Sequence, residues 1–254
     1  MASLRFFTFA APARFYAIAG RLVPWCWAVF AAAAAVGLWL GFVEAPTDAT
    51  QGEVYRIIFI HVPAAWMSML LYCVMAFWAA IGWAFNARLA SMTARAIAPT
   101  GALFTAIALW TGAVWGQPTW GTWWVWDARL TSELLLLFLY LGFMALVGAI
   151  DDTRRADKAG ALLAVVGVVN VPVIYFSVKW WNTLHQGASV SLTAAPRMAS
   201  LMVMAMLVMT IAFWAYAFAV VFMRTRAIVL EREAHARWAA DEALPDLPMT
   251  LRTT

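Results

Sequence analysis

Charged side chains are scarce in this chain: they make up 12% of its 254 residues, against 65% that are hydrophobic. A soluble domain of this size needs more polar surface, so that class of protein is excluded. The charges are also grouped, and they leave six stretches without any Asp, Glu, Lys or Arg: 22–43, 57–87, 96–126, 134–150, 159–178 and 198–223. Because about 20 apolar residues in a helix cross the hydrocarbon core of a membrane, each stretch can form a transmembrane helix.

Helices are favoured over barrel strands, because a helix satisfies its own backbone in lipid and these stretches lack the alternation of strands. We predict an all-α membrane protein, a bundle of six transmembrane helices forming a single domain over residues 1–254. The predicted spans are roughly 22–43, 62–84, 96–115, 132–150, 159–178 and 198–223. Three loops, at about 44–61, 116–131 and 179–197, then lie at the end of the bundle opposite both termini.

Several motifs are missing. The two cysteines, Cys26 and Cys73, are single, and no Cys-x-x-Cys-His is present, so the chain does not attach haem covalently as a c-type cytochrome does. The phosphate-binding Gly-x-x-x-x-Gly-Lys pattern is also missing, so ATP-driven work would need another subunit. No charge falls in the middle of a span, which disfavours a coupled pump, and no general acid, base or nucleophile stands out. We therefore expect a protein that is not an enzyme.

The basic residues predict the orientation of the chain. Thirteen of the 17 lie on the side of the termini, and only Arg56, Arg129, Lys179 and Arg197 lie on the other. The positive-inside rule then places both termini in the cytoplasm and the three loops outside. Residues 1–21 do not resemble a cleaved signal peptide, and we expect an interfacial lead-in to the first span. The stretch Arg224–Trp238 either docks a partner or forms a plain solvated helix.

The middle outward loop is rich in tryptophan. Five indole rings fall within twelve residues: Trp115, Trp120, Trp123, Trp124 and Trp126. Such rings collect at membrane interfaces as an aromatic belt, which is one reading of this loop. Gly116, Pro118 and Gly121 are expected to break the helix here and to let the rings form a compact shelf. A shelf of flat rings suits a large, flat, apolar ligand, so a binding platform is the other reading.

Two histidines share the outward side with this loop. His61 precedes Val62-Pro63 and is expected just outside the second span, and His185 lies in the third outward loop. Each alone could be a polar cap at the interface. Together they suit the two axial positions of a metal in a flat macrocycle, such as haem. His235, on the tail at the other side, is expected to have no such role.

The outward side also carries three cations that are candidates for contact with the two haem propionates, namely Arg56, Arg129 and Lys179. Contact with lipid headgroups, or pairing with Asp127 or Glu133, is the structural alternative for each of them. Asp127 is expected to accept from indole N–H groups or to pair with Arg129, and so to fix the shape of the shelf.

The segment from Trp115 through Trp120-Gly-Thr-Trp-Trp-Val-Trp-Asp-Ala-Arg-Leu-Thr131 resembles the WWD motif of the haem-handling proteins. Within that superfamily, six spans and this length are similar to the cytochrome c maturation protein C (CcmC) family. The resemblance includes Ile60-His61-Val62-Pro63-Ala64-Ala65-Trp66 and Trp180-Trp181-Asn182-Thr183-Leu184-His185-Gln186-Gly187. It implies that His61 and His185 are axial haem ligands. It also implies a haem platform made of Trp115, Trp120, Gly121, Trp123, Trp124, Trp126 and Asp127.

The resemblance implies a setting as well. Such proteins hold haem b without a covalent bond at the periplasmic face of the bacterial inner membrane. They present it to a haem chaperone, cytochrome c maturation protein E (CcmE), for the biogenesis of c-type cytochromes. An ABC-type pair, CcmA and CcmB, and the small membrane protein CcmD associate with them. Two alternatives stay open: an exporter that moves haem across the bilayer, and an enzyme that forms the haem–chaperone bond by orientation alone.

Overall fold

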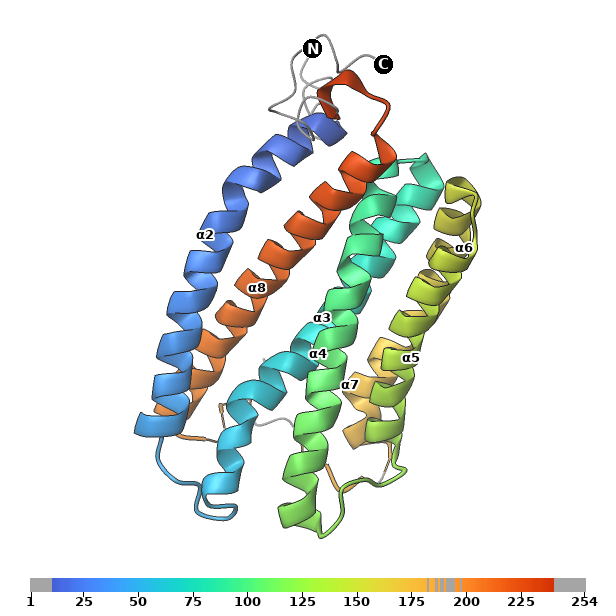
Figure 1. Ribbon diagram of the computed structural model, residues 1–254. Coiled ribbons are helices and arrows are strands. Elements are labelled where there is room, and N and C mark those ends of the chain that lie inside the picture. The colour runs from blue at the N-terminus through green and yellow to red at the C-terminus, as the bar shows by residue number, and fades with distance from the viewer. Residues whose placement is uncertain are drawn as a thin grey trace.

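The computed structural model describes residues 11–181, 183–185, 187, 190, 195, 196 and 198–239. Within these residues the regular structure is helical, apart from an isolated bridge between Asp48 and Gly52. The elements run in the order α2 (Pro12–Trp39), the π-helical turn η2 (Leu40–Glu44), the 3-10 turn η3 (Glu53–Ile57), α3 (Ile58–Phe85), α4 (Arg88–Trp120), α5 (Ala128–Ala149), α6 (Thr153–Gly167), α7 (Asn170–Trp180) and α8 (Ser200–Arg232) (Figure 1).

Six helical segments are long and apolar enough to cross a membrane, which confirms the all-α prediction of six spans. They are Pro12–Glu44, Glu53–Phe85, Arg88–Trp120, Ala128–Ala149, Thr153–Trp180 and Ser200–Arg232. The lead-in expected over residues 1–21 lies outside the described residues up to residue 10, and from Pro12 it is part of α2. Of the expected third loop, 179–197, only part is described.

The start of the second span differs from the prediction. His61 was expected just outside it, but the helix begins at Ile58, directly after η3, and His61 and Pro63 both lie inside α3. The reason is that Ile58 and Phe59 bury apolar surface against the bundle and extend the helix upstream of the proline. His61 therefore projects from the first turns of a helix, which holds it more rigidly than a loop would.

The end of the third span also differs. Gly116 and Pro118 were expected to break the helix, but α4 runs through both and ends at Trp120. Gly121 alone ends it, with the left-handed φ of 76° that glycine adopts without strain. Proline removes one backbone donor, and a transmembrane helix tolerates this loss where neighbouring groups compensate. The tryptophan motif is therefore the last turn of α4 followed by a short connection to α5.

The fifth span is broken. The predicted span, 159–178, lies within the segment Thr153–Trp180, which divides into α6 and α7 at Val168 and Val169. Asn170 is buried at this break, and its side-chain amide donates to the Ser132 carbonyl of α5 at 2.9 Å. This hydrogen bond ties the start of α7 to α5. α7 leads into the segment that carries His185.

The helices pack as two connected groups. α2 pairs with α8, and α3 pairs with α4 beside α5, α6 and α7 (Figure 1). The interior of the second group is filled by Tyr72, Tyr140, Phe104 and other fully buried side chains. Close approach depends on glycine here: a Cβ at Gly101 would overlap the Tyr140 ring.

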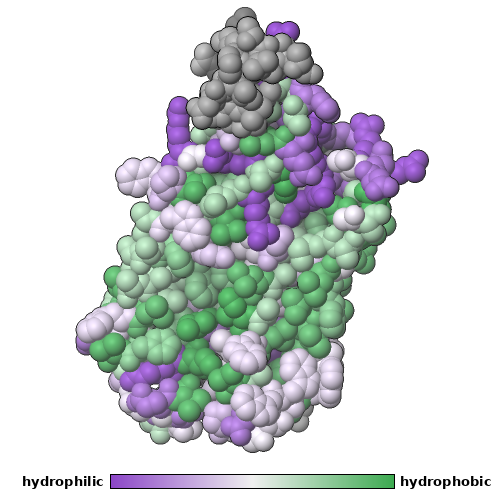
Figure 2. Space-filling view, in the orientation of Figure 1, coloured by the Kyte–Doolittle hydropathy of each residue, from purple (hydrophilic) through white to green (hydrophobic). Residues whose placement is uncertain are grey.

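The two ends of the bundle differ in character. α2 begins and α8 ends at the same end, where hydrophilic residues form a band above the apolar belt (Figure 2). The opposite end carries the η2–η3 connection, the turn from α4 to α5 and the segment after α7 (Figure 1). The candidate site residues from the sequence that the structure describes, His61, His185, Arg56, Arg129, Lys179 and the tryptophan motif, lie at this second end, which we term the loop end.

Candidate functional site

A pocket opens at the loop end between α3, α4, α5 and the segment that follows α7. The space between its lining atoms is about 440 Å³, counting the part that is open to the surroundings at the mouth. Its lining is apolar except for a few polar side chains. The lining residues are His61, Ala65, Ala108, Leu109, Gly112, Ala113, Trp115, Trp120, Trp124, Arg129, Leu130, Glu133 and His185.

His61 is held by Thr111 of α4. Its Nδ1 lies 2.9 Å from the Thr111 hydroxyl oxygen. That hydroxyl has a single proton, which it donates to the Ile107 carbonyl at 2.6 Å, so it accepts from Nδ1–H of the histidine. The network therefore assigns the Nδ1–H tautomer and leaves Nε2 with its lone pair as a potential metal ligand.

Gly112 of α4 leaves room for the same ring. A Cβ at this position would lie 3.2 Å from Cε1 of His61, closer than nearly all ordinary Cβ contacts. A residue larger than glycine would therefore press on the ring. Two neighbouring residues of α4 therefore set the position of the His61 imidazole: Thr111 through its hydroxyl group and Gly112 through its lack of a side chain.

His185 reaches the pocket from the other side. Its ring centre lies 6.1 Å from that of His61, 5.7 Å from Trp115 and 6.2 Å from Trp120. Its backbone N–H donates to the Thr183 hydroxyl at 3.1 Å, and that hydroxyl donates to the Asp127 carboxylate. A residue of the α4–α5 connection thus fixes the segment that carries the histidine.

Asp127 does not play the role expected from the sequence. It was expected to accept from indole N–H groups or to pair with Arg129. Instead it caps α5, accepting from the Leu130 backbone N–H at 2.8 Å, and accepts from Thr183 with its other oxygen. An aspartate at the N-cap stabilises the helix start, so one side chain both starts α5 and positions the His185 segment.

The tryptophans divide into two groups. Trp115 is 3% exposed and donates from Nε1 to the Gln51 side chain at 2.7 Å, and its ring packs on Trp120 with centres 5.2 Å apart. Trp124 also lines the pocket. Its buried indole N–H has no hydrogen-bond partner among the described residues. Trp123 and Trp126 are 59% and 77% exposed and do not line the pocket, and neither does Gly121.

Of the three candidate cations, the structure brings only Arg129 into the pocket. Arg129 donates from Nη1 to the Ile174 carbonyl of α7 at 2.8 Å, which leaves other donors of its guanidinium available. Lys179 is exposed and lies over the Phe176 ring, 5.9 Å from its centre.

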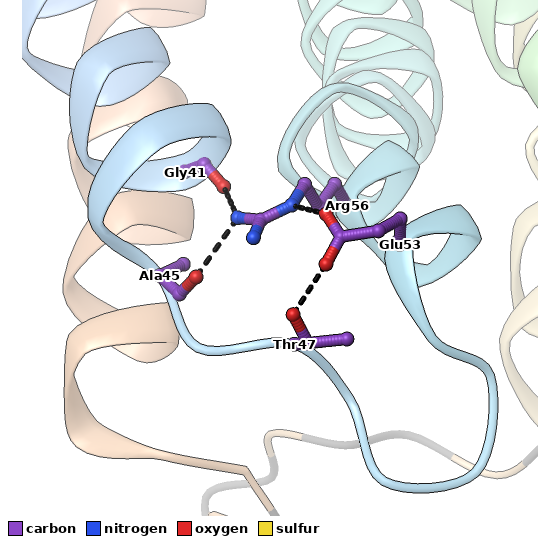
Figure 3. A network of polar contacts seen from close by, with 5 residues as sticks. All are labelled: Gly41, Ala45, Thr47, Glu53 and Arg56. Atoms are coloured by element: carbon purple, nitrogen blue, oxygen red, sulfur yellow. Dashed lines mark hydrogen bonds and ion pairs between the residues drawn. The ribbon is translucent and has the colours of Figure 1, made fainter.

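Arg56 is engaged elsewhere. Its Nη1 donates to the carbonyls of Gly41 and Ala45 at 2.8 and 2.9 Å, and its Nε pairs with Glu53 (Figure 3). Glu53 in turn accepts from Thr47 (Figure 3). Because these contacts join the end of η2 to η3, Arg56 holds the connection between these two turns together and does not line the pocket.

Glu133 is a pocket residue that the sequence did not identify as part of the site. It is 7% exposed, and one carboxyl oxygen accepts from the Ser68 hydroxyl of α3 at 2.7 Å. Its other oxygen is buried without a partner among the described residues. The available signal was its position four residues after Arg129, which places both side chains on one face of α5. From the sequence it was considered only as a possible ion-pair partner of the three candidate cations.

The arrangement suits a metal that brings most of its own ligands. Within the described parts of the chain, no group of three or more His, Cys, Asp or Glu side chains could hold a bare metal ion. A metal–histidine bond is about 2 Å and the ring centre lies about 1 Å further, so two rings on opposite sides of one metal are roughly 6 Å apart. The 6.1 Å between His61 and His185 matches that geometry.

Comparison with known proteins identifies the family. The chain matches the family model described as Heme exporter protein C (CcmC) over residues 5–240. It is 53% identical to heme exporter protein C of Escherichia coli K12 over 180 residues, 71% of this chain and 74% of that protein. The protein of the same name from Haemophilus influenzae is 41% identical over 230 residues, 91% of this chain and 94% of that protein. The one from Paracoccus denitrificans is 39% identical over 234 residues, 92% and 97% of the two chains. The chain therefore belongs to the heme exporter protein C family.

Proposed function

We propose that this protein binds haem b without a covalent bond at the loop end of the bundle, with His61 and His185 as the two axial ligands. The observation that carries the proposal is the pair of imidazole rings, which face one pocket with centres 6.1 Å apart. The Thr111 contact supports it, because a ligating histidine usually donates its other ring N–H to a fixed acceptor. The family name supports the choice of haem over other flat ligands.

The walls of the pocket are chemically suited to a porphyrin. Trp115, Trp120 and Trp124 offer aromatic surface to a flat apolar ring. Haem also carries two carboxylates, and Arg129 and the unpartnered Trp124 N–H are donors on the pocket wall that suit them. We therefore assign the propionate contact to Arg129 rather than to Arg56 or Lys179. Trp123, Trp126 and Gly121 belong to the rim of the platform, where a partner could reach them.

Holding haem is favoured over exporting it through this bundle. A path for haem would have to pass between the helices toward the end opposite the loop end, where α2 begins, α8 ends and most basic residues lie; we term it the basic end. Directly beneath the pocket, the bundle is filled by Tyr72, Tyr140 and Phe104, which are 0 to 2% exposed. Opening a route of haem width would require these rings to leave a packed core. We therefore keep export through this chain as the second candidate.

The proposed role is delivery. Two neutral ligands and aromatic walls would hold haem in one orientation at the mouth of the pocket, where the haem chaperone CcmE would take it for c-type cytochrome biogenesis. This chain would act by orientation and not as an enzyme. The basic end would face the cytoplasm and the loop end the periplasm, in the bacterial inner membrane. CcmA, CcmB and CcmD would be its partners in an ABC-type complex, with ATP hydrolysis outside this chain.

The test measures binding and delivery separately. The protein is purified in mild detergent after expression with CcmE, and haem is quantified on each protein. We expect His61→Ala and His185→Ala to lose most co-purifying haem, whereas replacing Trp123 and Trp126 leaves haem on this protein and reduces haem on CcmE. Full haem content in both histidine variants would refute the ligand assignment. Unchanged delivery by the tryptophan variants would restore the aromatic belt reading for the rim.

A further inference from the structure

A second cavity lies at the basic end of the bundle, far from the histidine pocket along α4 and α5. It has about 740 Å³ of empty space, part of it open to the surroundings. α4, α5 and α8 line it with mostly apolar side chains and two arginines. The lining residues are Arg95, Ala96, Pro99, Phe143, Met144, Val147, Gly148, Arg224, Ala227 and Ile228.

The two arginines differ from Arg232 and Arg88, which lie at the same end. Arg232 makes two hydrogen bonds to Asp157, at 2.7 and 2.8 Å, and Arg88 forms an ion pair with Glu233. In the described part of the chain, Arg95 of α4 and Arg224 of α8 have neither a hydrogen bond nor an ion pair. No acidic residue lines the cavity. Arg95 lies within electrostatic reach of Asp157 and Glu231 but forms a direct ion pair with neither. The two guanidinium groups therefore flank the apolar hollow with hydrogen-bond donors still available.

Position and charge identify the class of ligand. Arg95 lies two turns into α4 and Arg224 two turns from the end of α8. Each directly flanks a charge-free stretch, 96–126 or 198–223, so both lie at the border between charged and apolar residues. A phosphate at that border would meet both guanidinium groups. Hydrocarbon chains below it would meet the apolar side chains of Pro99, Phe143 and Val147. A basic pocket between transmembrane helices with this character is typical of an anionic lipid site.

We propose that this cavity binds an anionic phospholipid, with its phosphate on Arg95 and Arg224 and an acyl chain between α4, α5 and α8. The proposal is independent of the haem site, because no residue lines both cavities. Such a lipid would contact α4, α5 and α8 together. It would lie at the same end of the bundle as the contact between α6 and α8 that Asp157 and Arg232 form.

Gly148 offers a way to fill the cavity without disturbing the packing. It lines the cavity, and a Cβ built on it meets no atom within 4 Å. Gly148→Phe should therefore occupy the space of the acyl chain. Ala145→Phe is the matched control, since Ala145 lies on the same helix, is exposed and does not line the cavity. For the charges, Arg95→Gln/Arg224→Gln is compared with Arg154→Gln/Arg155→Gln, which removes two exposed cations elsewhere at the same end.

The experiment is native mass spectrometry of the purified protein in detergent with added phosphatidylglycerol, cardiolipin or phosphatidylethanolamine. We expect one retained phosphatidylglycerol or cardiolipin. Its apparent affinity should fall on the order of 10- to 30-fold in Arg95→Gln/Arg224→Gln and similarly in Gly148→Phe, with both controls unchanged. Haem binding should be unchanged in all variants, which reports that each has folded. Equal retention of phosphatidylethanolamine, or undiminished binding in Arg95→Gln/Arg224→Gln and Gly148→Phe, would overturn the proposal.

Discussion

His61 and His185, from opposite halves of the chain, place their imidazole rings 6.1 Å apart over one pocket. Each ring is positioned by a different hydroxyl: Thr111 fixes His61 directly, and Thr183 fixes the backbone of His185. Substitutions at Thr111 and at Thr183 should therefore disturb the two histidines separately, although both histidines belong to one site.

Removing the hydroxyl of Thr111 should weaken haem binding without unfolding the protein. Thr111→Val is similar in size but cannot accept from Nδ1–H of His61, so the tautomer and ring orientation are no longer fixed. We expect haem affinity to fall roughly 10- to 100-fold, measured by haem transfer to apomyoglobin. Thr111→Ser keeps the hydroxyl and should remain within a few-fold of wild type. Equal losses in both variants would assign the effect to packing.

Adding a methyl group beside His61 is a second test of ring position. Gly112→Ala would place a Cβ 3.2 Å from Cε1 of His61, so the ring must shift by a few tenths of an ångström. We expect weaker haem retention and a shifted Soret band. Gly142→Ala on α5 is the control, because its Cβ would make ordinary contact at 3.7 Å with Leu163. A normal Soret band in Gly112→Ala would show that the ring can yield at no cost.

Asp127 should affect haem through His185, beyond its effect on helix capping. Asp127→Ala removes both the cap of α5 and the acceptor for Thr183. Asp152→Ala removes an equivalent cap from α6, where Asp152 accepts from the Arg155 N–H at 2.7 Å. Each should cost about 1 kcal/mol in stability, but only Asp127→Ala should lower haem content. Thr183→Val also removes the acceptor for the His185 N–H, so it should lower haem content at least as much as Asp127→Ala. Combining the two changes should lower haem content no further than Thr183→Val alone, and an additive loss would show that Asp127 acts independently of Thr183.

The three outward cations should give three different results. Arg129→Gln should reduce haem retention, because Arg129 lines the pocket. Arg56→Gln should retain haem near wild-type affinity but lower the free energy of unfolding, on the order of 2 kcal/mol, because it loses charged bonds to two backbone carbonyls. Lys179→Gln should change neither haem affinity nor the free energy of unfolding. Haem titration and thermal unfolding in the same detergent distinguish these outcomes, and a loss of haem affinity confined to Arg56→Gln would contradict the assignment.

Much of the fold was predictable, because the length of an apolar run is a local property of the sequence. The helix ends were less so. Pro118 is compatible with a helix only because of its surroundings, and the start of α3 upstream of His61 depends on burial of Phe59. The break at Val168 and Val169 carries no signal in an apolar stretch, since the partner of Asn170 is a carbonyl on α5.

The site was predictable in its residue types but not in its contacts. The grouping of His61, His185 and the tryptophans follows from topology, since loops on one side of the membrane lie close together. Topology does not show which of Arg56, Arg129 and Lys179 lines the pocket. That depends on which backbone carbonyls lie within reach of each side chain. Glu133 was missed as a pocket residue because burial against Ser68 is a tertiary fact. Asp127 was misassigned because its partner, Thr183, is distant in sequence.

The most direct test of the account is the electron paramagnetic resonance spectrum of the purified protein with ferric haem. Wild type should give the low-spin signal of iron with two histidine ligands. His61→Ala and His185→Ala should each lose that signal in favour of high-spin haem or no haem, and His235→Ala, on the tail beyond α8, should keep it. A low-spin signal that survives in either His61→Ala or His185→Ala would contradict the proposal that these two residues hold the iron between them.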